Sequence, residues 1–297
     1  MTVRWGILST ARINLLVLDD AAESEIARFV AVASRDRARA EAFARKNRLE
    51  RAWGSYEELL EDAEIDAVYV SLPNELHVPW TLRALEAGKH VLCEKPLTRH
   101  TAEAEEAFDL AERSGLILME AFMYRHHPQT IRLGELVRGG VVGELRVVRA
   151  SFSFPATEPE DRKLFAGADG GSLMDVGCYC VNVGRFLAGE PDRVFAERVA
   201  NENGLDVRFV AVLRHSEGVL TYFDCGIDIP SREELEVVGS EGTIAVRDPW
   251  HHLEPALEIR RAGRVERVEF EPGNAYRYEV ENVSRAVLGE TQPLLGR

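Results

Sequence analysis

The sequence predicts an α/β domain with a doubly wound parallel sheet, followed by an α+β domain built on a large, mostly antiparallel open sheet. In the first part, short apolar strand patterns alternate with helical patterns up to about residue 120, which is typical of parallel sheets with helices on both faces. From about residue 191, strand patterns follow one another across tight turns, which indicates antiparallel pairing. A chain of 297 residues is long enough for two such domains, at roughly 100–200 residues each.

The composition argues against several classes of partner. The formal net charge of −14 speaks against a nucleic acid or an anionic membrane as the main partner. No apolar run approaches the ~20 residues of a membrane-spanning helix, and the first residues lack the charged start and apolar middle of a signal peptide. The four cysteines show neither a Cys-x-x-Cys pair nor a zinc spacing, so we expect reduced thiols, no metal and a cytoplasmic protein.

A turn suited to a dinucleotide pyrophosphate follows the first strand pattern, residues 3–8. In parallel sheets such a turn leads into a helix whose free N–H groups bind phosphate. Ser9 and Ala11 stand where two glycines would be expected, so the glycine fingerprint is weak, although Ala11 leaves room for a close phosphate. The residues expected at the dinucleotide here are Gly6, Ser9, Thr10, Ala11, Arg12 and Ile13.

The end of the second strand pattern, residues 29–33, bears on the choice between NAD and NADP. An acidic side chain at this point would bind the ribose hydroxyls of NAD. Ser34 and Arg35 instead offer a hydroxyl and a guanidinium, which suit a 2′-phosphate, so we expect NADP rather than NAD. The alternative is that Arg35 is an exposed arginine at a helix start.

Three further turns are predicted at the same edge of the parallel sheet, because the carboxyl ends of parallel strands meet there. They follow the strand patterns at 65–70, 89–92 and 116–119. The second contains Glu94-Lys95-Pro96, which places Lys95 where open sheets bind ligands; the alternative is a surface lysine beside a turn. His77 would lie beside a bound nicotinamide, unless it is only a structural residue at a helix start. The candidate cofactor contacts in these turns are Ser71, Leu72, Pro73, Asn74, His77, Glu94, Lys95 and Glu120.

The second half of the chain combines one polar helix face with a series of strands. A helical pattern runs from Ser172 to about Leu187, and on an α-helix Asp175, Tyr179 and Asn182 would share one face. The alternative is a buried tyrosine whose hydroxyl is satisfied by Asp175. Further helical patterns are expected at 127–139 and 276–288. Strand patterns are expected at 145–154, 194–200, 206–213, 219–225, 234–238, 243–246, 257–260 and 264–270.

Several of these segments together resemble the Gfo/Idh/MocA oxidoreductases over nearly the whole chain. The segments that carry the resemblance are Trp5-Gly6-Ile7-Leu8-Ser9-Thr10-Ala11-Arg12-Ile13, Ser71-Leu72-Pro73-Asn74 with His77, Glu94-Lys95-Pro96, Met119-Glu120-Ala121-Phe122-Met123-Tyr124-Arg125 and Asp175-Val176-Gly177-Cys178-Tyr179. The family's usual helix motif is Asp-x-Gly-x-His-x-x-Asp. Here Tyr179 replaces the histidine and Asn182 the second aspartate, which is similar to the NADP-dependent D-xylose 1-dehydrogenases and dimeric dihydrodiol dehydrogenases.

The resemblance implies a Rossmann dinucleotide-binding domain over residues 1–120 and a substrate-binding and oligomerisation domain over residues 121–297. The closing helix at about 276–288 would be able to pack back toward the first domain. Arg125 and Arg162 match positions that contact cofactor or substrate in the family. The implied substrate contacts are Lys95, Arg125, Phe154, Asp175, Tyr179 and Asn182. Candidate pocket walls are Phe152, Phe154, Trp250 and Tyr276, with core packing as the alternative for each.

The implied chemistry is a proton relay between Tyr179 and Lys95. NADP would lie over the sheet edge with its nicotinamide near Lys95, and Tyr179 would take the substrate's hydroxyl proton as hydride leaves the same carbon. An unperturbed phenol has a pKa of ~10, and a nearby ammonium favours the phenolate. Asp175 would orient the substrate or the Tyr179–Lys95 pair.

Two classes of function follow from these residues. The first is an NADP-dependent dehydrogenase acting on a sugar or cyclic diol, with oxidation of an aldopyranose such as D-xylose or D-glucose ahead of the diol. The second is a non-catalytic, NADP-sensing binding protein on the same fold. The pair Lys95 and Tyr179 favours the enzyme, because binding alone needs no proton relay. A homodimer or homotetramer through the second sheet is expected, because one face of that sheet needs cover.

Overall fold

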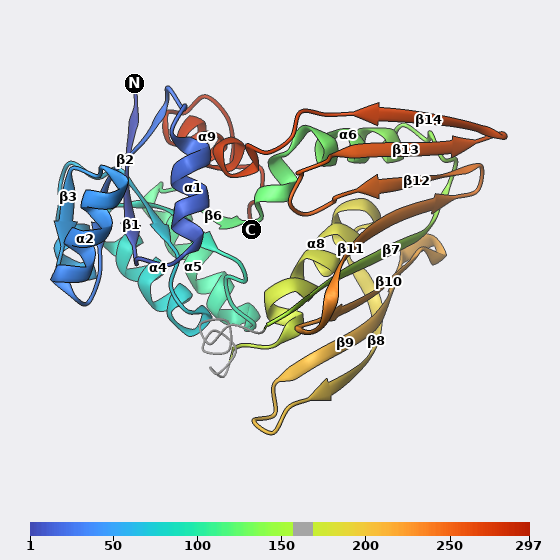
Figure 1. Cartoon of the computed structure of the whole chain (residues 1–297), viewed down its shortest axis with the longest axis horizontal. Helices are drawn as coiled ribbons and strands as arrows, with labels where there is room; N and C mark the ends of the chain where they lie inside the picture. The colour runs from blue at the N-terminus through green and yellow to red at the C-terminus, as the bar shows by residue number, and fades with distance from the viewer. Residues whose placement is uncertain (157–168) are drawn as a thin grey trace. The chain divides into compact units, whose positions relative to one another are not determined.

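The chain, seen in a computed structural model, is described for residues 1–156 and 169–297. Its described residues divide into two compact units, one of residues 1–126 with 274–297 and one of residues 127–273. Each unit is built around one sheet (Figure 1). No helix in the described ranges combines the length and the apolar character that crossing a membrane would require.

The first unit contains the predicted doubly wound parallel sheet. Its strands run in the order β3-β2-β1-β4-β5-β6, and every neighbouring pair is parallel. The first strand therefore lies inside the sheet, and the chain winds outward from it in both directions. The strands are β1 (Val3–Leu8), β2 (Ala27–Ala33), β3 (Arg51–Trp53), β4 (Ala67–Val70), β5 (His90–Glu94) and β6 (Leu118–Ala121).

Two apolar clusters hold helices against the two faces of this sheet. One cluster joins the sheet to α3 (Tyr56–Leu60), α4 (His77–Glu86) and α5 (Thr101–Ser114). The other joins it to α1 (Ile13–Ala21), α2 (Arg37–Asn47) and α9 (Ala275–Val287). The last of these comes from the end of the chain, and the indole Nε1 of Trp5 in β1 donates a 3.1 Å hydrogen bond to Ser284 Oγ of α9.

The second unit contains the predicted large open sheet, with strand order β14-β13-β12-β11-β7-β10-β9-β8. Neighbouring strands are antiparallel except for β7 and β10, which are parallel. The strands are β7 (Leu145–Pro155), β8 (Pro191–Ala200), β9 (Asp206–His215), β10 (Leu220–Gly226), β11 (Asp228–Gly239), β12 (Gly242–Arg247), β13 (Ala256–Arg261) and β14 (Arg264–Glu269).

One face of the second sheet is covered within its own unit by α6 (Pro128–Arg138), by the π-helical segment η3 (Leu173–Gly177) and by α8 (Cys178–Ala188). The burial of β9 and β10 alternates accordingly, with Leu213 and Phe223 buried and Val212 and Tyr222 exposed. The short 3₁₀ segments are η1 (Asn74–Leu76), η2 (Met123–His126) and η4 (Ser216–Gly218).

The structure corrects two boundaries that matter for the site. The strand expected at 116–119 is β6, which starts at Leu118, because Gly115 and Leu116 still close α5 through a hydrogen bond from Leu116 N–H to the Ala111 carbonyl. Glu120 therefore lies within the strand rather than after it. The helix expected from Ser172 begins with the π turn η3, so the α-helical spacing assumed for Asp175 and Tyr179 does not apply across it.

Candidate active site

The turn after β1 is closed by the side chain of Ser9. Ser9 has a φ of +135°, in the region that favours glycine, which explains why a glycine would be expected there. Its hydroxyl lies 2.8 Å from the Ser71 carbonyl oxygen and accepts a 3.1 Å hydrogen bond from the Ala11 N–H. One hydroxyl thus links the turns after β1 and β4 and fixes the backbone that leads into α1.

A second side chain, not among the predicted site residues, supports the same turn. Asn14 is fully buried, and its Nδ2 donates a 3.0 Å hydrogen bond to the Ser9 carbonyl oxygen. The only signal in the sequence was an amide at the start of an otherwise apolar helical stretch. The buried amide therefore supports the turn, in which Thr10 lies, while Arg12 is the N-cap of α1 and Ile13 its first residue. Gly6 lies in β1, where an added Cβ would sit 2.7 Å from Leu59 Cδ2.

The end of β2 carries two exposed arginines close to one phenol. Arg35 and Arg39 both act on Tyr56: burial raises the pKa of this phenol, and the positive charge of Arg35, its hydrogen bond and the charge of Arg39 oppose the rise. Ser34 is buried, and its Oγ accepts a hydrogen bond from the Asp36 N–H at 3.3 Å. The guanidiniums are therefore the groups at this strand end that face solvent with positive charge.

The turn that carries Lys95 is held from two sides. The Lys95–Pro96 peptide bond is cis. The buried imidazole of His77 lies with Nδ1 2.8 Å from the Pro96 carbonyl oxygen and Nε2 2.7 Å from the Leu72 carbonyl oxygen. Glu120 Oε1 accepts a 2.8 Å hydrogen bond from the Leu97 N–H. His77 and Glu120 thus fix the two residues that follow Lys95, and Lys95 itself is partly exposed.

Acidic and phenolic groups of the first unit surround the base of this turn. The Tyr69 hydroxyl donates to Glu94, the residue before Lys95. Glu279 of α9 is buried, and burial together with the charge of Glu94 raises its pKa well above the ordinary range. Burial also raises the pKa of Tyr276, as do Glu94 and Glu279, whereas Lys95 opposes the rise. Lys95 is therefore an amine electrostatically coupled to the buried polar groups of this unit.

In the second unit, Tyr179 lies in the first turn of α8, directly after η3. Only 6% of Tyr179 is exposed, and its ring meets Phe152 and Trp250 edge-on, with centroids 5.3 and 5.7 Å away. Trp250 is fixed in turn, because its Nε1 donates a 3.0 Å hydrogen bond to the Ser151 carbonyl oxygen. Two of the four aromatic residues predicted as pocket walls, Phe152 and Trp250, thus pack against the phenol ring. Asp175, Asn182 and Phe154 are partly exposed in the same unit.

Close contact with the sheet fixes the segment that carries Asp175 and Tyr179. A Cβ added to Gly177 would lie 2.7 Å from Cys225 Sγ of β10, so glycine lets η3 approach the sheet. Asp206 Oδ2 accepts hydrogen bonds from Ser172 Oγ at 2.6 Å and from the Leu173 N–H at 2.7 Å. The glycine of the Asp-x-Gly motif therefore has a packing reason, and Asp206 caps the start of the turn.

The structure gathers the predicted residues into one group in each unit. In the first unit, the turns after β1, β4 and β5 are tied together by Ser9 and His77, and Arg125 lies in η2 of the same unit. In the second unit, Phe152 and Tyr179 are in direct contact. Arg162 lies outside the described residues.

Comparisons with known proteins agree with this architecture. Residues 4–122 match the family described as "Oxidoreductase family, NAD-binding Rossmann fold", and residues 130–245 match the Gfo/Idh/MocA C-terminal domain. The chain belongs to the Gfo/Idh/MocA family of oxidoreductases. The fold class and the family resemblance expected from the sequence are therefore confirmed.

Its relatives include enzymes that act on sugars and on a cyclic diol. The chain is 41% identical to D-xylose 1-dehydrogenase (NADP(+)) 2 of Haloferax volcanii, over 97% of this chain and 90% of the relative. It is 34% identical to trans-1,2-dihydrobenzene-1,2-diol dehydrogenase of Danio rerio, over 97% and 89% of the two chains. A similar solved structure is a 3-ketoreductase from Actinomadura kijaniata in complex with NADP and TDP-benzene, at a TM-score of 0.88 and 31% identity over 99% and 92% of the two chains.

Proposed function

We propose that this protein is an NADP-dependent oxidoreductase that transfers hydride between the nicotinamide and a sugar or a cyclic diol. The observation that carries the proposal is the phenol of Tyr179, held by Phe152 and Trp250 in the turn of the Asp-x-Gly motif. The 41% identity to an NADP-dependent D-xylose 1-dehydrogenase, which extends over 97% of the chain, supports the same function and favours an aldopyranose as substrate.

The first unit offers groups that suit both the pyrophosphate and the 2′-phosphate of NADP. The turn after β1 combines the small Ala11 with the N-terminus of α1, an arrangement that suits a pyrophosphate. Arg35, after the end of β2, and Arg39, in the first turn of α2, offer guanidiniums where a 2′-phosphate would need them. The positive φ of Ser9 belongs to a turn that normally uses glycine for close approach of the backbone to phosphate.

The proton chemistry is assigned to Tyr179 and Lys95. A bound nicotinamide would supply the acceptor for the hydride that leaves the hydroxyl-bearing carbon of the substrate. Tyr179 takes the proton of that hydroxyl at its phenolic oxygen. In this proposal the Lys95 ammonium favours the phenolate form of Tyr179 and donates a hydrogen bond to the substrate oxygen. Asp175 orients the substrate from the turn before Tyr179. His77 and Glu120 fix the turn of Lys95, so that the amine is positioned before substrate arrives.

A panel of substrates tests the proposal. Absorbance at the reduced-nicotinamide band is followed with NADP and D-xylose, D-glucose, other pentoses and hexoses, and trans-dihydrodiols. Turnover of at least one of these, faster with NADP than with NAD, is expected. NADPH binding without turnover of any of them would instead favour the non-catalytic, NADP-sensing protein.

We further propose that two copies of the chain associate through the open face of the second sheet. On that face Phe195, Val212 and Tyr222 stand in register on β8, β9 and β10, and they are 67%, 37% and 44% exposed. Contiguous exposed apolar side chains of this kind mark association sites, and a self-complementary sheet face fits a twofold dimer. Sedimentation should give a dimer or tetramer that Tyr222→Glu dissociates and that Ile131→Glu, at an exposed isoleucine of α6 on the other face of the sheet, does not; a monomer would refute it.

A reducing, cytoplasmic location is proposed from the thiols. Cys93, Cys178, Cys180 and Cys225 are all free, and three of them are buried. Burial raises the pKa of Cys225 to about 12, so this thiol stays protonated and unreactive. Thiol titration of the unfolded protein, purified without reductant, should count four free thiols per chain.

A further inference from the structure

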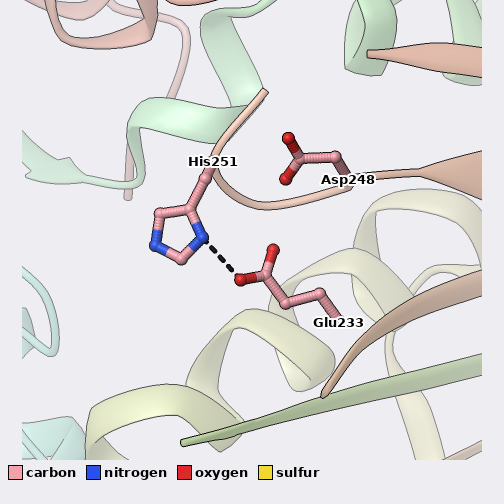
Figure 2. A group of neighbouring side chains, drawn as sticks. All are labelled: Glu233, Asp248 and His251. Carbon is pink, nitrogen blue, oxygen red and sulfur yellow. Dashed lines mark hydrogen bonds and ion pairs between the residues drawn. The ribbon is translucent and has the colours of Figure 1, made fainter. Parts of the chain in front are cut away.

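Three metal-ligating side chains converge in the second unit outside the Tyr179 turn. Glu233 lies on β11, and Asp248 and His251 lie in the connection between β12 and β13 (Figure 2). Each offers one ligand atom, and these atoms all lie within 4.8 Å of one another. In the part of the chain that the structure describes, no other group of three or more His, Cys, Asp or Glu side chains meets in this way.

Each of the three side chains is positioned by its own contacts or by its place in the sheet. Glu233 stands in register opposite Phe152, while its neighbour Glu234 points to the other face and pairs with Arg149. Asp248 has a φ of +46°, and its Oδ2 accepts hydrogen bonds from the N–H groups of the following turn, that of Glu254 at 2.9 Å. The imidazole of His251 lies edge-on to Phe152, with ring centroids 5.6 Å apart. Their convergence is therefore built by the backbone and does not depend on surface rotamers alone.

The charge balance of the group is incomplete. His251 Nδ1 lies 2.6 Å from Glu233 Oε1. This imidazole is the one side chain of the group that can carry positive charge, whereas the group holds two carboxylates. The second oxygen of Glu233, Oε2, is buried and has no hydrogen-bond partner, and Figure 2 shows it pointing toward the carboxylate of Asp248. A buried carboxylate oxygen without a donor is unfavourable, and a second carboxylate facing it adds repulsion. A cation between them would remove both penalties.

We propose that Glu233, Asp248 and His251 bind one divalent first-row transition-metal ion, for which Zn²⁺ is the probe. One imidazole nitrogen with two carboxylates suits Zn²⁺, Mn²⁺ or Co²⁺, whereas Mg²⁺ and Ca²⁺ prefer oxygen ligands alone. Bonds of about 2.0–2.2 Å place the ligand atoms of one ion roughly 3–4 Å apart, so side-chain rotations are enough to close the group. The imidazole must give up any proton at its ligating nitrogen, so binding weakens as pH falls.

The site would stabilise the segment that carries Trp250. Asp248 and His251 flank this tryptophan, whose ring packs against Phe152 and Tyr179. A bound ion would link the segment to β11 and so restrain Trp250, without taking part in hydride transfer. The sequence could not indicate this site, because its ligands come from a strand and a distant turn rather than from a spaced motif.

Calorimetric titration of the chelator-treated full-length protein with ZnCl₂ tests the site. We expect saturable binding of one ion per chain, a raised Tm, and at least a tenfold loss of affinity in His251→Ala and in Asp248→Asn. Glu234→Gln, at the neighbouring glutamate on the other face, and His100→Ala, at an exposed histidine, should bind as the wild type does. MgCl₂ should bind at least tenfold more weakly than ZnCl₂.

A spectroscopic arm keeps the test independent of folding defects. Co²⁺ bound by nitrogen and oxygen ligands should give visible absorption bands that Zn²⁺ abolishes and that His251→Ala lacks. The His251 side chain is 46% exposed, so its replacement leaves the core intact even if Asp248→Asn disturbs its turn. Absence of saturable Zn²⁺ binding, or binding of unchanged affinity in His251→Ala, would overturn the proposal.

Discussion

The imidazole Nδ1 of His77 lies 2.8 Å from the carbonyl oxygen of Pro96, so one buried ring joins the start of α4 to the turn that carries Lys95. Its other nitrogen lies 2.7 Å from the Leu72 carbonyl oxygen. Replacing His77 with alanine should therefore lower the free energy of unfolding by ~1–3 kcal/mol, because a buried carbonyl loses the N–H that a neutral imidazole donates to it. It should also raise KM for NADP. Urea unfolding at 25 °C and steady-state kinetics check both; His100→Ala is the control, and unchanged stability would rule out the link.

Buried neutral histidines should make the protein less stable in mild acid. Burial, with a smaller effect of Arg125, lowers the pKa of His126 to about 3, and burial also lowers that of His77. An unfolded histidine has a pKa of ~6.5, so below that pH the unfolded chain binds more protons than the folded one. As pH drops from ~6.5 to ~5, each such histidine should lower the free energy of unfolding by up to ~1.4 kcal/mol for every pH unit.

Urea unfolding at pH 7, 6 and 5 measures this slope. His126→Asn should reduce it by about one histidine's share, and the exposed His100→Asn should not. Equal slopes for His126→Asn and the wild type would show that His126 is not a source of the acid sensitivity.

The arginines at the end of β2 should decide between the two nicotinamide cofactors. Arg35→Ala is expected to lower kcat/KM for NADP at least tenfold and to leave kcat/KM for NAD nearly unchanged, because only NADP carries the 2′-phosphate. Arg37→Ala is the matched control, since Arg37 pairs with Glu58 at 3.1 Å. If the NADP/NAD ratio is the same before and after Arg35→Ala, Arg35 does not contact the 2′-phosphate.

The glycine of the Asp-x-Gly motif should be required for packing. Gly177→Ala places a methyl group 2.7 Å from Cys225 Sγ, so η3 must move or Cys225 must shift. Overpacking of this kind costs about 1–3 kcal/mol of stability. We also expect a lower kcat, because Tyr179 lies in the first turn of α8, two residues after Gly177. Adding Cys225→Ala should restore part of both losses. Loss of stability that Cys225→Ala does not relieve would place the strain elsewhere.

Much of the fold follows from patterns that the sequence shows directly. Apolar runs such as residues 3–8 and 89–92 alternate with helices, and buried parallel strands are expected from such runs. The parallel pairing of β10 with β7 is not predictable in this way, because turns between neighbouring strands say nothing about pairing across a long connection. The π turn at η3 is also hidden, since π and α spacing differ by one residue in a short segment.

The positions of the candidate site motifs in the fold were predictable where a motif has a fixed place on the sheet edge. Glu94-Lys95-Pro96 ends β5, and Ser71 to Asn74 follow β4, as expected for that edge. The supporting residues were not predictable. Asn14, Glu279 and Glu233 act through partners on other elements, and only the folded chain brings them together. Buried polar residues in apolar patterns are the one signal that such partners exist.

Replacement of Tyr179 with phenylalanine tests the central claim most directly, because the ring that packs against Phe152 and Trp250 is kept and only the hydroxyl is lost. Hydride transfer is measured as reduction of NADP in single turnovers with the best substrate of the panel, alongside NADPH binding by fluorescence. The proton relay predicts a loss of roughly 10²–10⁴-fold in the rate with unchanged NADPH binding. Hydride transfer that stays within a few-fold of the wild-type rate would contradict it.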